Sequence, residues 1–363
     1  MFGCYTSGLS LQLSRTGEWF LRSGIQQPDG GVARYYLVDA GRNLPASTEI
    51  TGYAVSAFVY LYSVTHDAHY LDRALLGARY LIRAWEPASE TMPFEIAPAA
   101  YTYFFDCGIV ARGLLSVWRA TGEQEFLDAA VAIGLSMARD FASPTGDFHP
   151  ILALPSKTPL PRDPLRWSRT ATCYQLKSAM AWWDLFEATG DHRFVAPYER
   201  VLEASLRTYA DFLPGHPERR KVMDRLHAFS YFLEGLLPRA TEPRAAAALR
   251  DGIGRAACHL RDIAPEFARS DVYAQLLRVR LYADWLGAVP LDRPAAELEA
   301  AQLAAFQATD ADPRLNGGYW FGRTPGEFLP FINPVSAAFA SQTLELWETS
   351  CAGGAQAHRH LLI

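Results

Sequence analysis

Long segments with apolar residues at helical spacing alternate with loops rich in Pro, Gly and Asp, while strand signals are few. Residues 30–36 suggest one short extended piece. A repeat marks the helix corners: residues 64–67, 120–123 and 188–191 each end one helix, start the next and precede an aromatic–aliphatic pair. Glycine favours the left-handed ending, and the acidic residue that follows favours the next helix start. A recurring unit of about 60 residues is typical of an α/α solenoid or toroid.

Extending this pattern predicts six helical hairpins. Six segments are apolar nearly all round and must be buried on every side, so they form an inner ring; the other six carry charge on one face and form an outer ring. We therefore predict an all-α (α/α)6 barrel, with residues 1–352 as one domain and 353–363 as a short C-terminal tail that frays. The inner helices are expected near 48–65, 102–121, 168–189, 226–237, 271–286 and 334–348, and the outer helices near 12–26, 69–86, 124–141, 194–212, 243–264 and 291–307.

The loops are of two kinds. Connections from inner to outer helices are mostly short corners, whereas connections from outer to inner helices are mostly long: 27–47, 87–101, 142–167, 213–225 and 308–333. Long loops without secondary structure are usually functional. The long loops would share one rim with the N-terminus of every inner helix, so we expect a polar pocket there.

The candidate catalytic residues are Glu49, Asp106 and His227. Glu49 and Asp106 lie in strongly apolar segments, where an unpaired carboxylate is costly. His227 also fits the interpretation of a core histidine with satisfied hydrogen bonds. The candidate substrate-binding residues are Arg169, Tyr53, Tyr174, Tyr231, Asp271, Tyr273, Trp167, Tyr319, Trp320 and Asn333, of which Asp271 and Asn333 also suit plain helix caps.

Two chemistries fit these residue types. A buried carboxyl with a raised pKa can protonate a leaving group while a better solvated carboxylate acts as base or nucleophile, as in glycoside cleavage. Tyr or His can instead abstract a proton beside a uronate carboxyl that Arg or Asn holds, which leads to elimination or epimerisation. The sequence leaves both open.

Composition narrows the partners. The net charge of −5 and the absence of a long basic run argue against nucleic acid. No run approaches the roughly 20 apolar residues that span a bilayer, so no membrane association is expected. The scattered Cys4, Cys107, Cys173, Cys258 and Cys351 fit reduced thiols in a cytoplasmic protein. The pair Cys258–His259 has no third ligand at useful spacing, so neither a metal nor another cofactor is expected.

Five segments resemble bacterial proteins of the six-hairpin glycosidase-like superfamily, in particular members associated with polysaccharide biosynthesis. They are residues 27–32, 48–53, 105–108, 227–237 and 316–319. The resemblance implies a sugar or oligosaccharide in the toroid mouth. Related families include unsaturated glucuronyl hydrolases, N-acylglucosamine epimerases, uronate lyases and glucuronyl epimerases. The chain departs from several of them, since it has no adjacent Asp–Asp pair near the pocket and no clear set of catalytic histidines.

The leading hypothesis is a carbohydrate-active enzyme, with hydrolysis placed ahead of uronate lyase or sugar epimerase chemistry. A terpenoid-cyclase-like toroid is an alternative, but such enzymes need clustered aspartates, and Asp310-Ala311-Asp312 is the nearest match. A non-catalytic sugar-binding protein is a third hypothesis. Substrate and oligomeric state are not indicated by the sequence.

Overall fold

The computed structural model describes residues 11–356 and 358–363, and Cys4 therefore lies outside it. The described residues form twelve α-helices in alternating outer and inner positions, which confirms the all-α class. The outer helices are α1 (Leu11–Arg22), α3 (Ala68–Ala84), α5 (Gln124–Asp140), α7 (Val195–Thr208), α9 (Pro243–Ile263) and α11 (Arg293–Ala304). The inner helices are α2 (Thr48–Thr65), α4 (Phe104–Thr121), α6 (Gln175–Thr189), α8 (Arg219–Gly235), α10 (Ser270–Trp285) and α12 (Pro334–Cys351).

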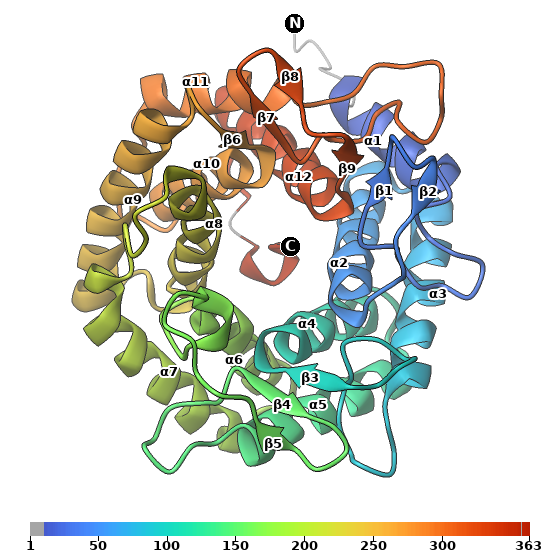
Figure 1. The fold of residues 1–363 in the computed structure, drawn as a ribbon, viewed down its shortest axis with the longest axis vertical. Coiled ribbons are helices and arrows are strands. Elements are labelled where there is room, and N and C mark those ends of the chain that lie inside the picture. Colours follow the sequence, from blue (N-terminus) through green and yellow to red (C-terminus); the bar gives the residue numbers. More distant parts are fainter. Residues whose placement is uncertain (1–10, 357) are drawn as a thin grey trace, which may run out of the picture.

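The inner helices form a closed ring. Each packs on the next in the order α2, α4, α6, α8, α10 and α12, and α12 packs back on α2. Figure 1 looks down the axis of this ring, with the outer helices around it. Because the inner helices contact neighbours on every side, nearly all of their residues are buried, as their continuous apolar pattern predicts.

The corners between inner and outer helices have the predicted chemistry. His66, Gly122 and Gly190 end α2, α4 and α6 in the left-handed conformation. Asp67 then accepts a hydrogen bond from a backbone N–H at the start of the next helix, and Asp191 does the same at its corner. The aromatic residue that follows each corner is buried in the hairpin.

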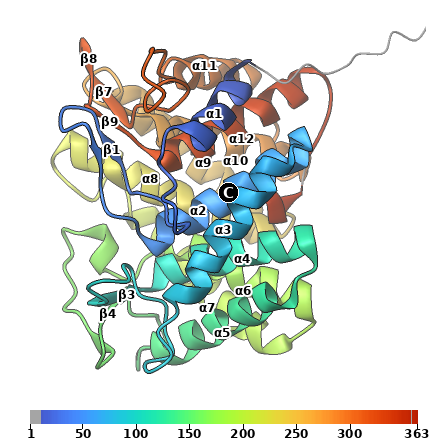
Figure 2. The same ribbon diagram turned by 90° about the vertical axis from the view of Figure 1, so that its right-hand side faces the viewer.

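The long loops carry three small antiparallel sheets. Their strand orders are β2-β1-β9, β3-β4-β5 and β6-β7-β8. Figure 2 shows the labelled strands at one end of the barrel. Strands β9, β3 and β6 each lead directly into an inner helix, so the sheets fix where those helices begin. The strands are β1 (Tyr36–Leu37), β2 (Arg42–Asn43), β3 (Tyr101–Tyr103), β4 (Ile151–Ala153), β5 (Thr158–Pro159), β6 (Ala268–Arg269), β7 (Gly322–Thr324), β8 (Glu327–Phe328) and β9 (Phe331–Ile332).

Four details differ from the sequence prediction. The helix expected from residue 226 begins at Arg219, and the helix expected from 168 begins at Gln175, after a short 3-10 turn over Trp167–Arg169. Strands of two or three residues are too short to give a periodic signal, so most of them were missed. The C-terminal tail does not fray: Leu362 and Ile363 are buried in the middle of the ring (Figure 1).

Within residues 11–356 and 358–363, no helix is long and apolar enough to cross a membrane.

Candidate active site

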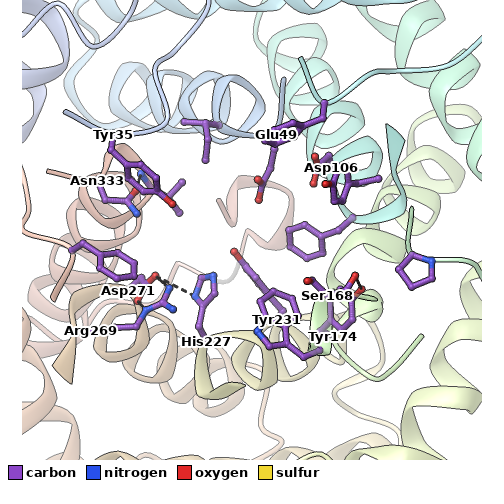
Figure 3. Close-up of a pocket in the computed structure, with 18 residues that line it drawn as sticks. Tyr35, Glu49, Asp106, Ser168, Tyr174, His227, Tyr231, Arg269, Asp271 and Asn333 are labelled. Atoms are coloured by element: carbon purple, nitrogen blue, oxygen red, sulfur yellow. Dashed lines mark hydrogen bonds and ion pairs between the residues drawn. The ribbon is translucent and has the colours of Figure 1, made fainter. Parts of the chain in front are cut away.

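A cavity of about 350 Å³ opens on the long-loop rim. It is lined mainly by the first turns of inner helices and by the residues just before them. Glu49, Asp106 and Asp271 lie in the first turns of α2, α4 and α10, and Asn333 caps α12. Figure 3 shows how these side chains surround the cavity. The capping and strand pairing that position the helix starts therefore also position the polar groups of the cavity.

One side of the cavity is an ionic cluster. Arg269 donates hydrogen bonds to both carboxylate oxygens of Asp271 and also pairs with Asp224 at 2.9 Å. Burial raises the pKa of Asp271, but the charges of Arg269 and His227 outweigh burial and hold it below its usual value. Asp271 is therefore ionised, and both of its carboxylate oxygens accept hydrogen bonds from Arg269.

His227 lies next to this cluster. Its Nδ1 is 2.7 Å from Oε1 of Gln275 and 3.3 Å from Oδ2 of Asp271. Both neighbours are acceptors, so Nδ1 carries the proton and Nε2 of the neutral ring keeps a free lone pair. Burial lowers the pKa of His227 more than Asp271 raises it, which favours the neutral ring.

The other side of the cavity holds two carboxyl groups without ionic partners. Burial raises the pKa of Glu49 to about 7. Burial, together with the neighbouring Glu49, raises the pKa of Asp106 well above its usual value. Oδ2 of Asp106 is buried without a hydrogen-bond partner. Within the described residues, no cation pairs with either group, so both tend to keep their protons.

Aromatic rings complete the walls and floor. The Tyr231 ring packs edge-on against His227 and lies 4.6 Å from the Phe105 ring. Tyr174 packs edge-on against Trp167 on the loop side. In Figure 3 the Tyr231 hydroxyl points into the cavity between Glu49 and His227. Such a wall suits the apolar faces of a sugar ring as well as its hydroxyl groups.

The structure brings eight of the thirteen candidate residues to this one cavity. They are Glu49, Asp106, His227, Trp167, Tyr174, Tyr231, Asp271 and Asn333.

The other five candidates lie elsewhere. Tyr53 is buried beneath the floor beside Tyr231, and Arg169 lies on the rim close to Tyr103. Tyr273 lines a separate hollow beneath α9 and α11. Tyr319 is fully buried, and Trp320 stacks on Phe328. Gly317, just before Tyr319 and Trp320, has a left-handed backbone conformation. The loop turns at this glycine, so both side chains pack into the rim and point away from the cavity.

Several lining residues were missed by the sequence analysis. Tyr35 arrives from the first long loop, and Arg269 is the last residue before α10. Tyr103 holds the same position before α4. Arg269 and Tyr103 could have been selected by their position directly before an inner helix, but the sequence analysis used this signal only for Asn333.

The described residues contain no group of three or more His, Cys, Asp or Glu side chains that could hold a metal ion. Cys258 is exposed on α9 and does not line the cavity.

No protein-family model matches the sequence, and no curated protein is detectably similar to it. Solved structures are similar in fold. The chain is similar to cellobiose 2-epimerase from Spirochaeta thermophila, with a TM-score of 0.71 and 15% identity over 94% of this chain and 96% of that one. It is similar to a D-mannose isomerase, with a TM-score of 0.69 and 12% identity over 96% and 100%.

A third similar structure is the GH76 α-mannanase BT2949 of Bacteroides thetaiotaomicron, with a TM-score of 0.66 and 10% identity over 94% of this chain and 97% of that one. At such low identity these matches establish the fold alone. Together with the closed ring of six hairpins, they show that the chain has the (α/α)6 toroid fold, which it shares with carbohydrate-active epimerases, an isomerase and a glycoside hydrolase.

Proposed function

We propose that this protein is an enzyme that moves a proton at the carbon beside the carbonyl of a neutral reducing sugar, which epimerises or isomerises that sugar. The observation that carries the proposal is that His227, whose Nε2 is free, and Glu49, whose pKa burial raises to about 7, line the same cavity. Figure 3 draws these two side chains on opposite sides of the space that a ligand would fill. Base and acid on two sides of one bound molecule are what this reaction needs.

The steps balance with the residues of the cavity and protons exchanged with solvent. Nε2 of His227 takes the proton from the carbon beside the carbonyl, and Glu49 donates its proton to the carbonyl oxygen, which gives an enediol. For isomerisation, Glu49 then takes the proton of the hydroxyl on the neighbouring carbon, and His227 returns its proton to the former carbonyl carbon. For epimerisation, Glu49 takes back the proton that it gave and passes it to the starting carbon from the opposite face, and the proton on His227 leaves to solvent while Glu49 regains one. Asp271 and Gln275 keep His227 in the required tautomer and stabilise its charged form.

The charges of the cavity favour a neutral sugar. Among its lining residues, all of them within the described chain, Arg269 is the sole Lys or Arg, and two aspartates already neutralise it. A uronate carboxylate would find no free cation among these lining residues. The uronate lyase alternative is therefore not favoured, because it needs a counter-charge for that carboxylate.

The size of the cavity and the structural neighbours are consistent with this choice. About 350 Å³ lies at the lower end of the range for small-molecule sites and suits a mono- or disaccharide. Two of the neighbours named above act on such sugars, as a cellobiose 2-epimerase and a D-mannose isomerase. These two neighbours support the substrate class only through the shared fold.

Hydrolysis of a glycoside is the second candidate, and the unpaired carboxyls favour it. Asp106 would be the general acid, and Glu49, which ionises near neutral pH, would be the base or nucleophile. It ranks second because these two groups come from adjacent helices and lie on the same side of the cavity in Figure 3. Glycosidases place their two carboxyls on either side of the bond that breaks.

The deciding experiment follows deuterium. The protein is incubated with D-mannose, D-glucose or cellobiose in heavy water, and proton NMR records exchange at carbon 2 and any new sugar. We expect exchange with wild-type protein, loss of exchange in His227→Asn and in Glu49→Gln, and normal exchange in the control His259→Asn, which lies on the outer helix α9.

Methyl β-cellobioside separates the two candidates because it has no free carbonyl at its reducing end. Cleavage of this glycoside without carbon-bound deuterium in any free sugar would replace the proposal with hydrolysis. If neither exchange nor cleavage occurs across these sugars, the proposed reaction is wrong for them.

A further inference from the structure

A second hollow lies beside the cavity on the same rim. It has a volume of about 400 Å³ and shares Trp167 and Ser168 with the cavity. Asp224, which lines the hollow, holds Arg269, which lines the cavity. The two spaces are thus separated by one short 3-10 turn and one ion pair. We call this second space the basic hollow, and its charged lining residues are Arg166, Lys221, Asp224 and Arg225, beside His216.

The basic hollow carries positive charge that the cavity lacks. Its one carboxylate, Asp224, is already paired with Arg269. Lys221 is exposed and makes no ion pair with any described residue, and Arg166 reaches Asp163 at 3.6 Å on the surface. The cavity, in contrast, is lined by two carboxyl groups with raised pKa values and by Asp271, which pairs with its one arginine. Such a difference in charge over a short distance predicts where a charged group of a ligand will sit.

Arg225 is the most informative residue of the hollow. Only 8% of it is exposed, and no carboxylate among the described residues pairs with it. Its guanidinium donates two hydrogen bonds to the backbone oxygen of Phe212 and stacks 4.2 Å above that ring. Gly215 makes this position possible, since a Cβ there would lie 2.4 Å from the guanidinium.

A buried cation without a counter-ion is costly unless an anion completes it. The neighbouring group able to carry negative charge is the Cys173 thiol, and burial raises the pKa of that thiol so that it stays neutral. Nothing in the described chain therefore supplies the missing negative charge beside Arg225, although the hollow in front of it is open to a ligand.

We infer that the basic hollow is a second subsite, which binds a carboxylate or phosphate group on the sugar unit next to the one in the cavity. The inference rests on the proposed function, since it assumes that a sugar occupies the cavity. Trp167 lies between the two spaces and offers a ring on which the connecting unit can stack. The substrate class is then an acidic disaccharide or longer oligosaccharide whose reacting unit is neutral.

The test compares three disaccharides by calorimetry: cellobiose, the same disaccharide with glucuronic acid as its non-reducing unit, and cellobiose phosphorylated on that unit. We expect wild-type protein to bind at least one charged disaccharide about tenfold more tightly than cellobiose, as one added charged hydrogen bond allows. The two charged probes distinguish a uronate from a phosphate.

Lys221→Glu should abolish this preference and leave the affinity for cellobiose within about twofold, because Lys221 is exposed and does not line the cavity. The matched control is Arg220→Glu. It makes the same charge change one residue earlier on α8, where Arg220 packs over Phe267 outside the hollow. Equal affinity of wild-type protein for all three disaccharides, or an equal loss in both variants, would overturn the inference.

Inorganic phosphate separates this inference from the proposed function. If no disaccharide binds, the cavity is not a sugar site, but broadening of the phosphate signal in ³¹P NMR still reports on the hollow. Broadening that Lys221→Glu removes and Arg220→Glu keeps would support an anion subsite. An unbroadened signal in wild-type protein would contradict it.

Discussion

At the scale of single residues, the cavity holds ionisable groups in two different electrostatic settings. Asp271 is kept ionised by Arg269, and it in turn lies beside His227. Glu49 faces the same space with no cation to offset its burial. Environments that push the pKa values of neighbouring groups apart are a frequent mark of acid–base catalysis. The separation arises here because ionic partners enter the cavity from α10 and its flanking strand, whereas α2 and α4 contribute carboxyls alone.

This arrangement predicts the sign of the pH dependence. Proton transfer as proposed needs His227 neutral and Glu49 protonated. Because the pKa of His227 is lowered from its usual 6.5 and that of Glu49 is raised to about 7, kcat/KM should be highest between the two pKa values, on the acidic side of pH 7, and should fall as the pH rises through about 7. The measurement is the pH profile of kcat/KM with whichever sugar exchanges deuterium.

The control is Glu95→Gln, which removes a rim carboxylate that pairs with Arg34 outside the cavity and should leave the profile unchanged. A profile that rises through pH 7 would mean that Glu49 acts in its ionised form. That outcome would contradict the proposed roles and favour the hydrolytic mechanism.

Position relative to the inner helices decided which site residues could be predicted from the sequence. Glu49, Asp106 and Asp271 were found because each sits in the first turn of an apolar helix, where a carboxylate stands out. Tyr319 and Trp320 were selected by residue type within a loop, and no periodicity indicates which way a loop side chain points. Tyr35 and Arg269 were missed for the same reason, since two-residue strands set their directions.

At the scale of elements, the sequence shows the corners between helices more clearly than the contacts among the inner helices. Each corner threonine acts twice: Thr121 donates to the backbone oxygen of Val117 and accepts from the backbone N–H of Glu123, and Thr65 and Thr189 do the same at their corners. This local chemistry repeats in the sequence, so the number and spacing of hairpins could be predicted. The close approaches between inner helices involve residues far apart in the chain and leave no such repeat.

Glycines on the inner helices allow those approaches. A Cβ on Gly108 of α4 would lie 2.4 Å from the backbone oxygen of Ser178 on α6. A Cβ on Gly235 of α8 would lie 2.6 Å from the backbone of Leu176, also on α6. Backbone atoms cannot rotate away as a flexible side chain can, so neighbouring helices of the ring would have to separate.

We therefore expect Gly108→Ala to lower the free energy of unfolding by about 1–3 kcal/mol, the usual cost of overpacking. The matched control is Gly254→Ala on the outer helix α9, where a Cβ would meet nothing within 4 Å. There the helical preference of alanine should stabilise the protein by about 0.5–1 kcal/mol. Urea unfolding of the two variants measures the difference, and equal effects would mean that the inner ring is not held at backbone contact.

At the scale of the whole molecule, the C-terminal tail fills the ring from the end opposite the cavity. The side chain of Arg359 pairs with Asp184 and Glu187 on α6. Lys177, also on α6, donates to the backbone oxygen of Ile363, and Gln342 on α12 bonds to the backbone of Leu361 and Ile363. Helices α6 and α12 stand across the ring from each other and are not neighbours in its order. The tail thus links two opposite sides of the barrel.

The role of the tail was not predicted, because its small residues from Gly353 onward, followed by His358-Arg359-His360, match a frayed end. The ring explains the difference. Lys177, Glu234 and Arg278 form a buried ionic cluster on the axis of the ring below the cavity. These charged groups need cover from water. Leu362 and Ile363 provide it, with 2% and 1% of their surfaces exposed.

It follows that a small change in the tail should act on the barrel and not on the cavity. Ile363→Ala removes a buried side chain, so the free energy of unfolding should fall by about 2–4 kcal/mol. Hydrogen exchange should increase in α6 and α12, the two helices that the tail connects, while binding of cellobiose stays within about twofold because the cavity lies at the other end of the ring. Leu298→Ala on α11 is the matched control, since that side chain is 54% exposed and its loss should cost less than about 0.5 kcal/mol. If both variants unfold alike and exchange in α6 and α12 is unchanged, the tail merely rests in the ring, and the inner helices hold the barrel closed without it.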